Sequence, residues 1–345
     1  MPIYQNGKEI TPKFNGKNLS RVMYNGGEIW PVEQSIISPS ESSPCDICFY
    51  DKTNDKLIIV RSNMWNIESF PSSKYAPIGV VVVPGIHNVY GDNSCGVMSL
   101  KSMNCDTPST GGISEQFMYW GVRDTNISGL PDLNRVSIGN TPNGIPTSSA
   151  SFAYLPSDKF SSAQCARDMD VYYDSSPYIP SPYLTNGSRN TGYYQTASPS
   201  SSNNALADFD GIGNTKKIIT QRGIKDYDSW IPNRTTEADY PAASCCDMFH
   251  TDGTQQGDWY LPACGELGYI MPSFNKINEI IGNMRTAYGS SIGVELNSNY
   301  GYLSSTEYNS NLTRLVTTNN GRVGNTSKYG SGYYVRAWLC VGGSK

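Results

Sequence analysis

Charged residues and histidines are scarce in this chain of 345 residues, and each shortage excludes a class of function. Only 16% of the residues are Asp, Glu, Lys or Arg, against about 25% in an average globular protein. The net charge of −4 lacks the basic excess with which a surface binds phosphates, so we expect no nucleic acid partner. With only His87 and His250 as bases, we expect no Ser-His-Asp or Cys-His catalytic group.

Long apolar runs and paired cysteine motifs are also missing. The longest apolar stretch, residues 78–83, is too short to cross a bilayer, so it predicts a buried strand and no membrane insertion. The nine cysteines are odd in number and repeat no spacing, which indicates mostly buried, reduced thiols. Cys45 and Cys48 lack a second pair at zinc-finger spacing, so we expect no zinc site.

Calcium is the one metal that the sequence leaves open, and we otherwise expect no cofactor. Residues 208–214 offer several carboxylate and amide oxygens, but they lack the closing Glu of a calcium-binding loop. An Asx-rich turn is the preferred interpretation of this segment. The first residues of the chain have neither the basic nor the apolar part of a secretory leader.

Three Asn-Gly pairs stand in the first thirty residues, each between an aromatic and an aliphatic residue: Asn6-Gly7, Asn15-Gly16 and Asn25-Gly26. Asn-Gly in this setting is a strong signal for a two-residue hairpin turn. Residues 1–33 therefore predict a small β-hairpin module, which is too small to bury a core and is expected to serve assembly or attachment. The Ser- and Pro-containing residues 34–44 then predict a linker.

The rest of the chain, residues 45–345, predicts one domain with a long insertion. Strands are expected over residues 47–50, 57–60, 78–83, 96–100 and 333–341. Helices are expected over residues 237–249 and 264–288, with Pro272 breaking the second. Residues 104–235 show little periodicity and predict ordered loops, anchored by aromatic residues that include Phe117, Tyr119 and Trp120.

Residues 297–334 have a composition suited to binding, because 29 of 38 are Asn, Ser, Thr, Gly or Tyr. Such residues bury little apolar area, so an ordinary polar loop is the plain alternative. The same mixture is typical of antibody loops, in which Tyr gives rigid contact area and Ser, Gly and Asn give adaptable hydrogen bonds.

Three motifs in order resemble a known family. The segment Gly-Asp-Trp-Tyr-Leu-Pro-Ala-Cys-Gly-Glu-Leu at residues 257–267 is similar to the G-x-W-x-L-P-x-x-x-E-L segment of bacterial and phage C-type-lectin-like domains related to the formylglycine-generating enzyme fold. Residues 302–311 resemble their W-S-S-T-E segment, with Leu303 where Trp is usual, and residues 334–337 resemble their closing strand. The pattern also resembles the variable proteins of diversity-generating retroelements, which include phage tropism determinants.

The resemblance implies an α+β fold: a C-type-lectin-like domain with a loop-rich insertion at about residues 104–235, preceded by the hairpin module. It implies that residues 297–338 form a diversifiable binding region. Trp259, Leu261, Pro262, Leu267, Leu303, Val335 and Trp338 would be scaffold, and Glu266 and Glu307 structural hydrogen-bonding groups. The implied ligand-facing residues are Tyr300, Tyr302, Tyr308, Ser310, Asn311, Arg314, Arg322, Asn325, Tyr329 and Tyr333.

The function that follows is non-enzymatic binding to a host-cell surface protein or glycan, by a protein of a phage tail tip or fibre that forms a homotrimer. A bacterial surface or fimbrial adhesin of the same fold is the first alternative. An enzyme of the formylglycine-generating kind is the second, and it would need a reactive Cys. The binding hypothesis expects that Ser at Tyr302, Tyr308 and Tyr329 leaves the melting temperature nearly unchanged while adsorption to host cells is lost.

Overall fold

This computed structural model describes six short strands within the first 28 residues, residue 205, and residues 35–85, 90–91, 93–104, 106–122, 124–133, 208–222, 240–298, 300–318, 323–329 and 333–343. The six strands form three antiparallel pairs, as predicted, and in the sequence one Asn-Gly pair stands between the two strands of each pair. Their bounds are β1 Ile3–Gln5, β2 Lys8–Ile10, β3 Lys13–Phe14, β4 Lys17–Asn18, β5 Met23–Tyr24 and β6 Gly27–Glu28.

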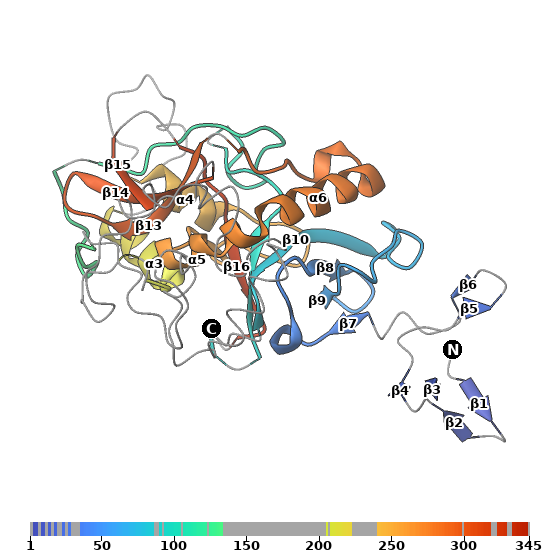
Figure 1. Ribbon diagram of the computed structural model, residues 1–345. Coiled ribbons are helices and arrows are strands. Elements are labelled where there is room, and N and C mark those ends of the chain that lie inside the picture. Colours follow the sequence, from blue (N-terminus) through green and yellow to red (C-terminus); the bar gives the residue numbers. More distant parts are fainter. Residues whose placement is uncertain are drawn as a thin grey trace, which may run out of the picture.

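An antiparallel sheet of seven strands, in the order β12-β16-β11-β10-β8-β9-β7, forms the centre of the main domain (Figure 1). Its strands are β7 Ile36–Ile37, β8 Ile47–Asp51, β9 Lys56–Val60, β10 Tyr75–Val83, β11 Cys95–Ser99, β12 Trp259–Tyr260 and β16 Trp338–Val341. The first four strands predicted in this domain are confirmed. The predicted strand over residues 333–341 is shorter, because Tyr333 and Tyr334 form isolated bridges elsewhere before β16 begins.

The predicted linker is wrong for residues 35–44, which belong to the main domain. Strand β7 pairs with β9 at the edge of the large sheet, and the 3-10 helix η2, Pro39–Glu41, follows it. The Ser42 hydroxyl is fully buried, donates to the Pro39 carbonyl at 2.6 Å and accepts from the Gly85 amide at 2.8 Å. A buried serine hydroxyl with both hydrogen bonds made is typical of a packed core, whereas a flexible linker would leave it exposed to water.

Alternate residues of each strand point to opposite faces of the large sheet. Both faces are buried, since each contributes to a hydrophobic core. In β8, Ile47 and Phe49 contribute to one core and Cys48 contributes to the other. The first core also holds the apolar side of helix α6, and the second holds the apolar residues Ala242, Ala243, Cys245 and Cys246 of α4. The sheet is therefore the central layer of an α+β domain.

The helices only partly match the predicted ranges. They are α3 Gly211–Arg222, α4 Pro241–Met248, α5 Cys264–Gly268, α6 Ile270–Tyr288 and the 3-10 helix η8 Ser290–Ile292. Pro241 occupies the first turn of α4, as expected. The helical stretch after Cys264 is interrupted at Tyr269 rather than at Pro272, which stands in the first turn of α6, where proline is tolerated. Helix α3 contradicts the expectation of loops throughout residues 104–235.

The start of α3 explains the oxygen-rich residues 208–214. The Asp210 carboxylate accepts the Gly213 amide at 2.9 Å, which caps the helix. The Asp208 carboxylate accepts the Asp210 amide at 3.2 Å, the Asn214 side chain at 2.9 Å and the Thr306 hydroxyl at 2.6 Å. The preferred Asx-turn interpretation is confirmed. Among the described residues, no group of three or more His, Cys, Asp or Glu is placed to hold a metal ion.

The last part of the chain contains a second antiparallel sheet, in the order β13-β14-β15. Its strands are β13 Gly301–Glu307, β14 Leu312–Thr317 and β15 Val323–Ser327. Tyr334 joins it to the closing part of the chain, since the Leu303 amide donates to the Tyr334 carbonyl at 2.9 Å and the Tyr334 amide to the Gly301 carbonyl at 3.0 Å. The Ser305 amide also donates to the Pro262 carbonyl at 2.8 Å. No helix in the described part of the chain is long and apolar enough to cross a membrane.

Glu266 holds the Leu-Pro motif in place from inside the protein. Its fully buried carboxylate accepts the Ala263 amide at 2.5 Å, the Tyr90 hydroxyl at 2.8 Å and the Tyr260 hydroxyl at 3.3 Å. The structural hydrogen-bonding role implied for Glu266 is therefore confirmed. Burial raises the pKa of Glu266 well above its ordinary value, against the opposing effect of these donors.

The raised pKa of Glu266 predicts how stability changes with pH. The folded state holds the Glu266 proton more tightly than the unfolded state, so this residue favours folding below the ordinary Glu pKa and loses that contribution as pH rises through the folded pKa. Glu266→Gln, which imitates the protonated form, is expected to show a smaller fall in the free energy of unfolding between about pH 4.5 and pH 7.5. Urea unfolding at stepped pH measures this fall. Glu279→Gln, at an exposed position on α6, is the matched control; an unchanged slope for Glu266→Gln contradicts the prediction.

Candidate binding surface

Five aromatic rings form two contacting groups, and we name them the aromatic surface: Phe117, Tyr119, Tyr300 and Tyr329, with Tyr334, which is buried and contacts Phe117 and Tyr300. Phe117 lies edge-on to Tyr300, with ring centroids 5.2 Å apart, and stacks on Tyr334 at 4.9 Å. Tyr119 stacks on Tyr329 at 5.4 Å. Phe117, Tyr300 and Tyr329 expose 52%, 45% and 56% of their area. Large rings this exposed in contact with each other are a candidate interaction site.

Backbone pairing fixes the two ring groups relative to each other. Met118 forms an antiparallel bridge with Tyr333, in which the Met118 amide donates to the Tyr333 carbonyl at 2.9 Å. Met118 and Trp120 point into the core, being 2% and 1% exposed, so Phe117 and Tyr119 point outward. Phe117 belongs to one ring group and Tyr119 to the other. Because two residues of extended chain span about 6.6 Å, this distance sets the spacing of the two groups along the chain.

Residues 121–122 and 124–133 hydrogen-bond to the second sheet and to residues that flank its strands, and we name them the covering segment (green in Figure 1). The Gly121 amide donates to the Lys328 carbonyl at 2.9 Å, and the Leu133 amide donates to the Glu307 carbonyl at 3.0 Å. The Arg314 guanidinium donates back to the Leu133 carbonyl at 3.0 Å. Every residue of β13 is buried, and the covering segment contributes to this burial at Glu307.

A buried ion pair fastens the covering segment to the sheet. The Lys328 ammonium donates to the Glu307 carboxylate, and both side chains are fully buried. Lys328 also donates to the Thr125 carbonyl at 2.7 Å, and its nitrogen lies 4.9 Å from the centre of the Trp120 ring. Glu307 accepts the Ile127 amide at 3.3 Å, so its implied structural role is confirmed. Burial raises the pKa of Glu307 and lowers that of Lys328, so each ion depends on the other for its charge.

A second buried group contains Tyr302, one of the residues expected to face a ligand. Tyr302 is only 1% exposed; its hydroxyl accepts the Asn297 amide at 2.9 Å and donates to the Glu115 carboxylate. Arg336, fully buried, donates to the same Glu115 oxygen at 3.0 Å and to the Leu100 carbonyl at 2.7 Å. Tyr302 is therefore a core residue, and the expectation that it faces a ligand is wrong.

The ten residues predicted to face a ligand occupy different environments. Arg314 is also buried, at 3% exposure, because it anchors the covering segment, so this expectation is wrong as well. Tyr308 and Ser310 are half-buried, and Tyr333 is half-buried against the second core. Asn311 and Asn325 are exposed, as are Tyr300 and Tyr329 of the aromatic surface. Arg322 lies outside the described residues.

Phe117 and Tyr119 were not among the predicted ligand-facing residues, although they supply the rings that Tyr300 and Tyr329 contact. The sequence names them only as anchors of the insertion. The four residues 117–120 are all large and mainly apolar. The sequence therefore shows no alternation of polar and apolar residues that would tell which side chains point outward. The signal that points to them is the exposure of Phe117 beside Tyr300 in the folded chain.

The described cysteines are reduced, and most are buried. Cys45, Cys48, Cys95, Cys245, Cys246 and Cys264 are buried and Cys340 is half-buried, which confirms the expectation of mostly buried thiols for the described part of the chain. Burial raises the pKa of Cys45, Cys95 and Cys264 to about 12. A thiol with such a pKa is almost wholly protonated at neutral pH and is a weak nucleophile.

The geometry therefore offers contact area and hydrogen bonds. The aromatic surface presents ring faces and two exposed phenol groups on a backbone that buried ion pairs hold in place. A scan of protein-family models, a search of curated proteins and a search of solved structures each found no match to this chain.

Proposed function

We propose that this protein is a non-enzymatic binding protein that attaches to a host-cell surface through the aromatic surface. The observation that carries the proposal is the contact of three well-exposed rings, Phe117, Tyr300 and Tyr329, with further rings across two chain segments. Aromatic side chains dominate binding energy at interfaces because they bring large area with few rotatable bonds.

The rigidity of the support favours binding. Ordering of flexible side chains and loops on association opposes affinity, by about 0.5–1.5 kcal/mol per immobilised side chain. Here Phe117 stacks on Tyr334, and Tyr119 on Tyr329, before any partner arrives. The backbone beneath them is paired at Met118 and Tyr333. Little further ordering is needed for a partner to dock.

The scaffold is proposed to be C-type-lectin-like. This proposal is supported by the way the three resembling motifs meet: the Leu303 amide donates to the Tyr334 carbonyl, and the Ser305 amide of the Ser-Ser-Thr-Glu segment donates to the Pro262 carbonyl of the Leu-Pro motif. Leu303, which stands where the family usually has Trp, is buried in the second core. An apolar anchor at this position is thus retained.

Attachment is proposed to occur as part of a phage tail tip or fibre, with the hairpin module of residues 1–33 serving assembly into a homotrimer. Several identical surfaces acting together raise avidity without any new contact, so a weak single site is sufficient. If residues 297–338 are diversified, variation is expected at exposed positions such as Asn311, Asn325 and Tyr329. It is expected to spare Tyr302 and Arg314, which are buried.

Replacing Phe117, Tyr300 and Tyr329 together by Ser is expected to weaken binding to cells at least tenfold while the melting temperature stays within a few degrees of the parent. The loss follows because aromatic residues central to an interface each contribute about 1–2 kcal/mol or more. Flow cytometry of the labelled full chain on a panel of bacterial strains measures binding, and calorimetry measures stability.

A matched control carries Ser at three exposed positions on other elements, Ile67, Lys74 and Asn275. This control is expected to bind the same strains as the parent. Parent-level binding by the aromatic variant, or equal loss in the control, overturns the proposal. Independently, the diversification proposal expects a near-copy of the DNA encoding residues 297–338, differing only where the copy has adenines, beside a reverse-transcriptase gene.

A further inference from the structure

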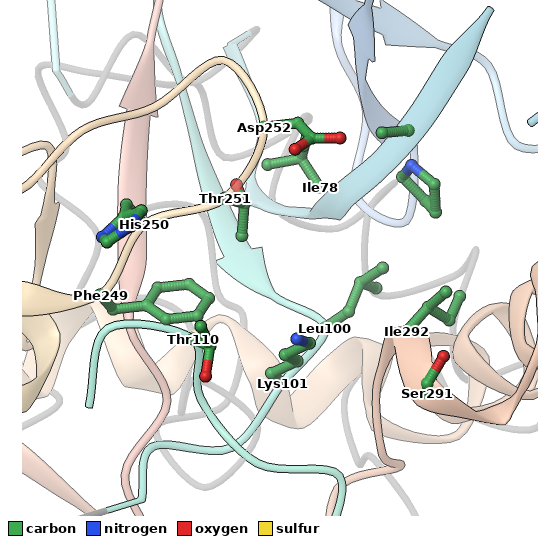
Figure 2. A pocket seen from close by; sticks show the side chains of 12 residues that line it. Ile78, Leu100, Lys101, Thr110, Phe249, His250, Thr251, Asp252, Ser291 and Ile292 are labelled. Carbon is green, nitrogen blue, oxygen red and sulfur yellow. The ribbon is translucent and has the colours of Figure 1, made fainter. Parts of the chain in front are cut away.

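A pocket separate from the aromatic surface opens where the start of β10, the end of β11, the loop after α4 and helix η8 meet (Figure 2). Its volume is about 450 Å³, within the range of small-molecule sites. Ile78, Leu100, Phe249 and Ile292 supply much of its apolar wall. Figure 2 shows Lys101 and Asp252 on opposite sides of the space between these side chains.

The walls of the pocket are fixed by the fold. The Leu100 carbonyl accepts the buried Arg336 guanidinium at 2.7 Å and the Val294 amide at 3.0 Å. Gly111, at φ +64°, packs so closely that a Cβ there would lie 3.0 Å from both the Lys101 side chain and the Phe249 ring. The His250 amide donates to the Ser109 carbonyl at 3.0 Å, which ties the loop after α4 to the same wall. The pocket is therefore preformed.

Lys101 places one positive charge at this apolar wall. Within the described part of the chain, no carboxylate lies within 4.0 Å of its ammonium group. Burial lowers the pKa of Lys101, which means that its charge is incompletely solvated. An anion bound next to Lys101 would supply the missing counter-charge, while Asp252 on the opposite side disfavours a second negative charge.

We infer that this pocket binds a small monoanionic carboxylate with a compact apolar body, such as an aromatic acid. The carboxylate pairs with Lys101, and the apolar body packs against Phe249, Leu100 and Ile292. This site is independent of the proposed attachment function, because none of the five rings of the aromatic surface lines it.

Isothermal titration of the full chain with four probes tests the inference. Phenylacetate has the charge and the ring; benzyl alcohol has only the ring, acetate only the charge, and terephthalate two charges. Phenylacetate is expected to bind with a Kd of about 0.1–5 mM. The other three are expected to bind at least fivefold more weakly.

Variants locate the binding on Lys101. Lys101→Met is expected to weaken phenylacetate binding at least tenfold, whereas Lys101→Arg stays within threefold of the parent. Lys276→Met, which removes an exposed lysine on α6 that does not line the pocket, is expected to bind as the parent does. Circular dichroism checks that each variant is folded. The inference is overturned if phenylacetate does not bind, if benzyl alcohol binds equally well, or if Lys101→Met retains parent affinity.

Discussion

Lys328→Met is expected to lower the free energy of unfolding by about 3–5 kcal/mol, because it leaves the buried Glu307 carboxylate without its cation. The change also removes the hydrogen bond to the Thr125 carbonyl and the contact with the Trp120 ring, and so loosens the covering segment. Urea unfolding at neutral pH measures the loss. A loss below about 1 kcal/mol would mean that the pair is solvated rather than buried.

Two further measurements separate the effect of the unpaired Glu307 charge on stability from the effect of lost packing: the pH dependence of unfolding and a second substitution. Burial already raises the pKa of Glu307, and removing Lys328 takes away an interaction that lowers it. In Lys328→Met, Glu307 therefore takes up a proton more readily, and the loss of stability is expected to shrink as pH falls. Adding Glu307→Leu is expected to recover part of the loss at neutral pH. The exposed pair of Lys276 and Glu279, 2.7 Å apart, is the control: Lys276→Met is expected to change stability by less than about 0.5 kcal/mol.

Tyr302→Ala is expected to lower the free energy of unfolding by about 3–5 kcal/mol, and Tyr329→Ala by less than about 1 kcal/mol. Tyr302 is 1% exposed, so its removal leaves a cavity and strips a hydrogen bond from Glu115. Tyr329 is 56% exposed and loses mainly its stacking on Tyr119. The sequence alone led to the opposite expectation for Tyr302, namely that Ser there leaves the melting temperature unchanged.

Parallel urea titrations of the two variants measure the difference. Tyr302→Phe is a useful intermediate, since it keeps the ring and removes only the hydroxyl; a loss of about 1–3 kcal/mol is expected. Equal losses for Tyr302→Ala and Tyr329→Ala would contradict the assignment of Tyr302 to the core and of Tyr329 to the surface.

Much of the large sheet could be predicted because apolar residues and turn residues determine it locally. Two short apolar runs at residues 47–51 and 56–60, with turn residues between them, predict a hairpin, and the Asn-Gly pairs predict the three strand pairs of residues 3–28. Helix α3 could not be predicted in this way. Its first turn contains Gly211, Gly213 and Asn214, which favour helices poorly. Tertiary contacts stabilise it instead, with Asn214, Thr215 and Ile218 buried.

The candidate site was harder to predict, because composition does not separate an exposed Tyr from a buried one. Tyrosine carries a large apolar ring and a polar hydroxyl, so it suits both Tyr302 in the core and Tyr329 on the surface. The difference depends on residues distant in the sequence: Tyr302 donates to the Glu115 carboxylate and packs against Tyr334, whereas Tyr329 stacks on Tyr119. Asn325 and Arg314 are register partners across β14 and β15, yet only Arg314 has the Leu133 carbonyl above it.

The pairing of Met118 with Tyr333 has a practical consequence for anyone who wishes to copy the aromatic surface. A synthetic peptide of residues 297–338 would contain Tyr300, Tyr329 and Tyr334 but would lack Phe117 and Tyr119, the rings they contact. Antibodies raised against such a peptide are expected to recognise the folded protein poorly. A graft onto another scaffold would need both chain segments, held in antiparallel register.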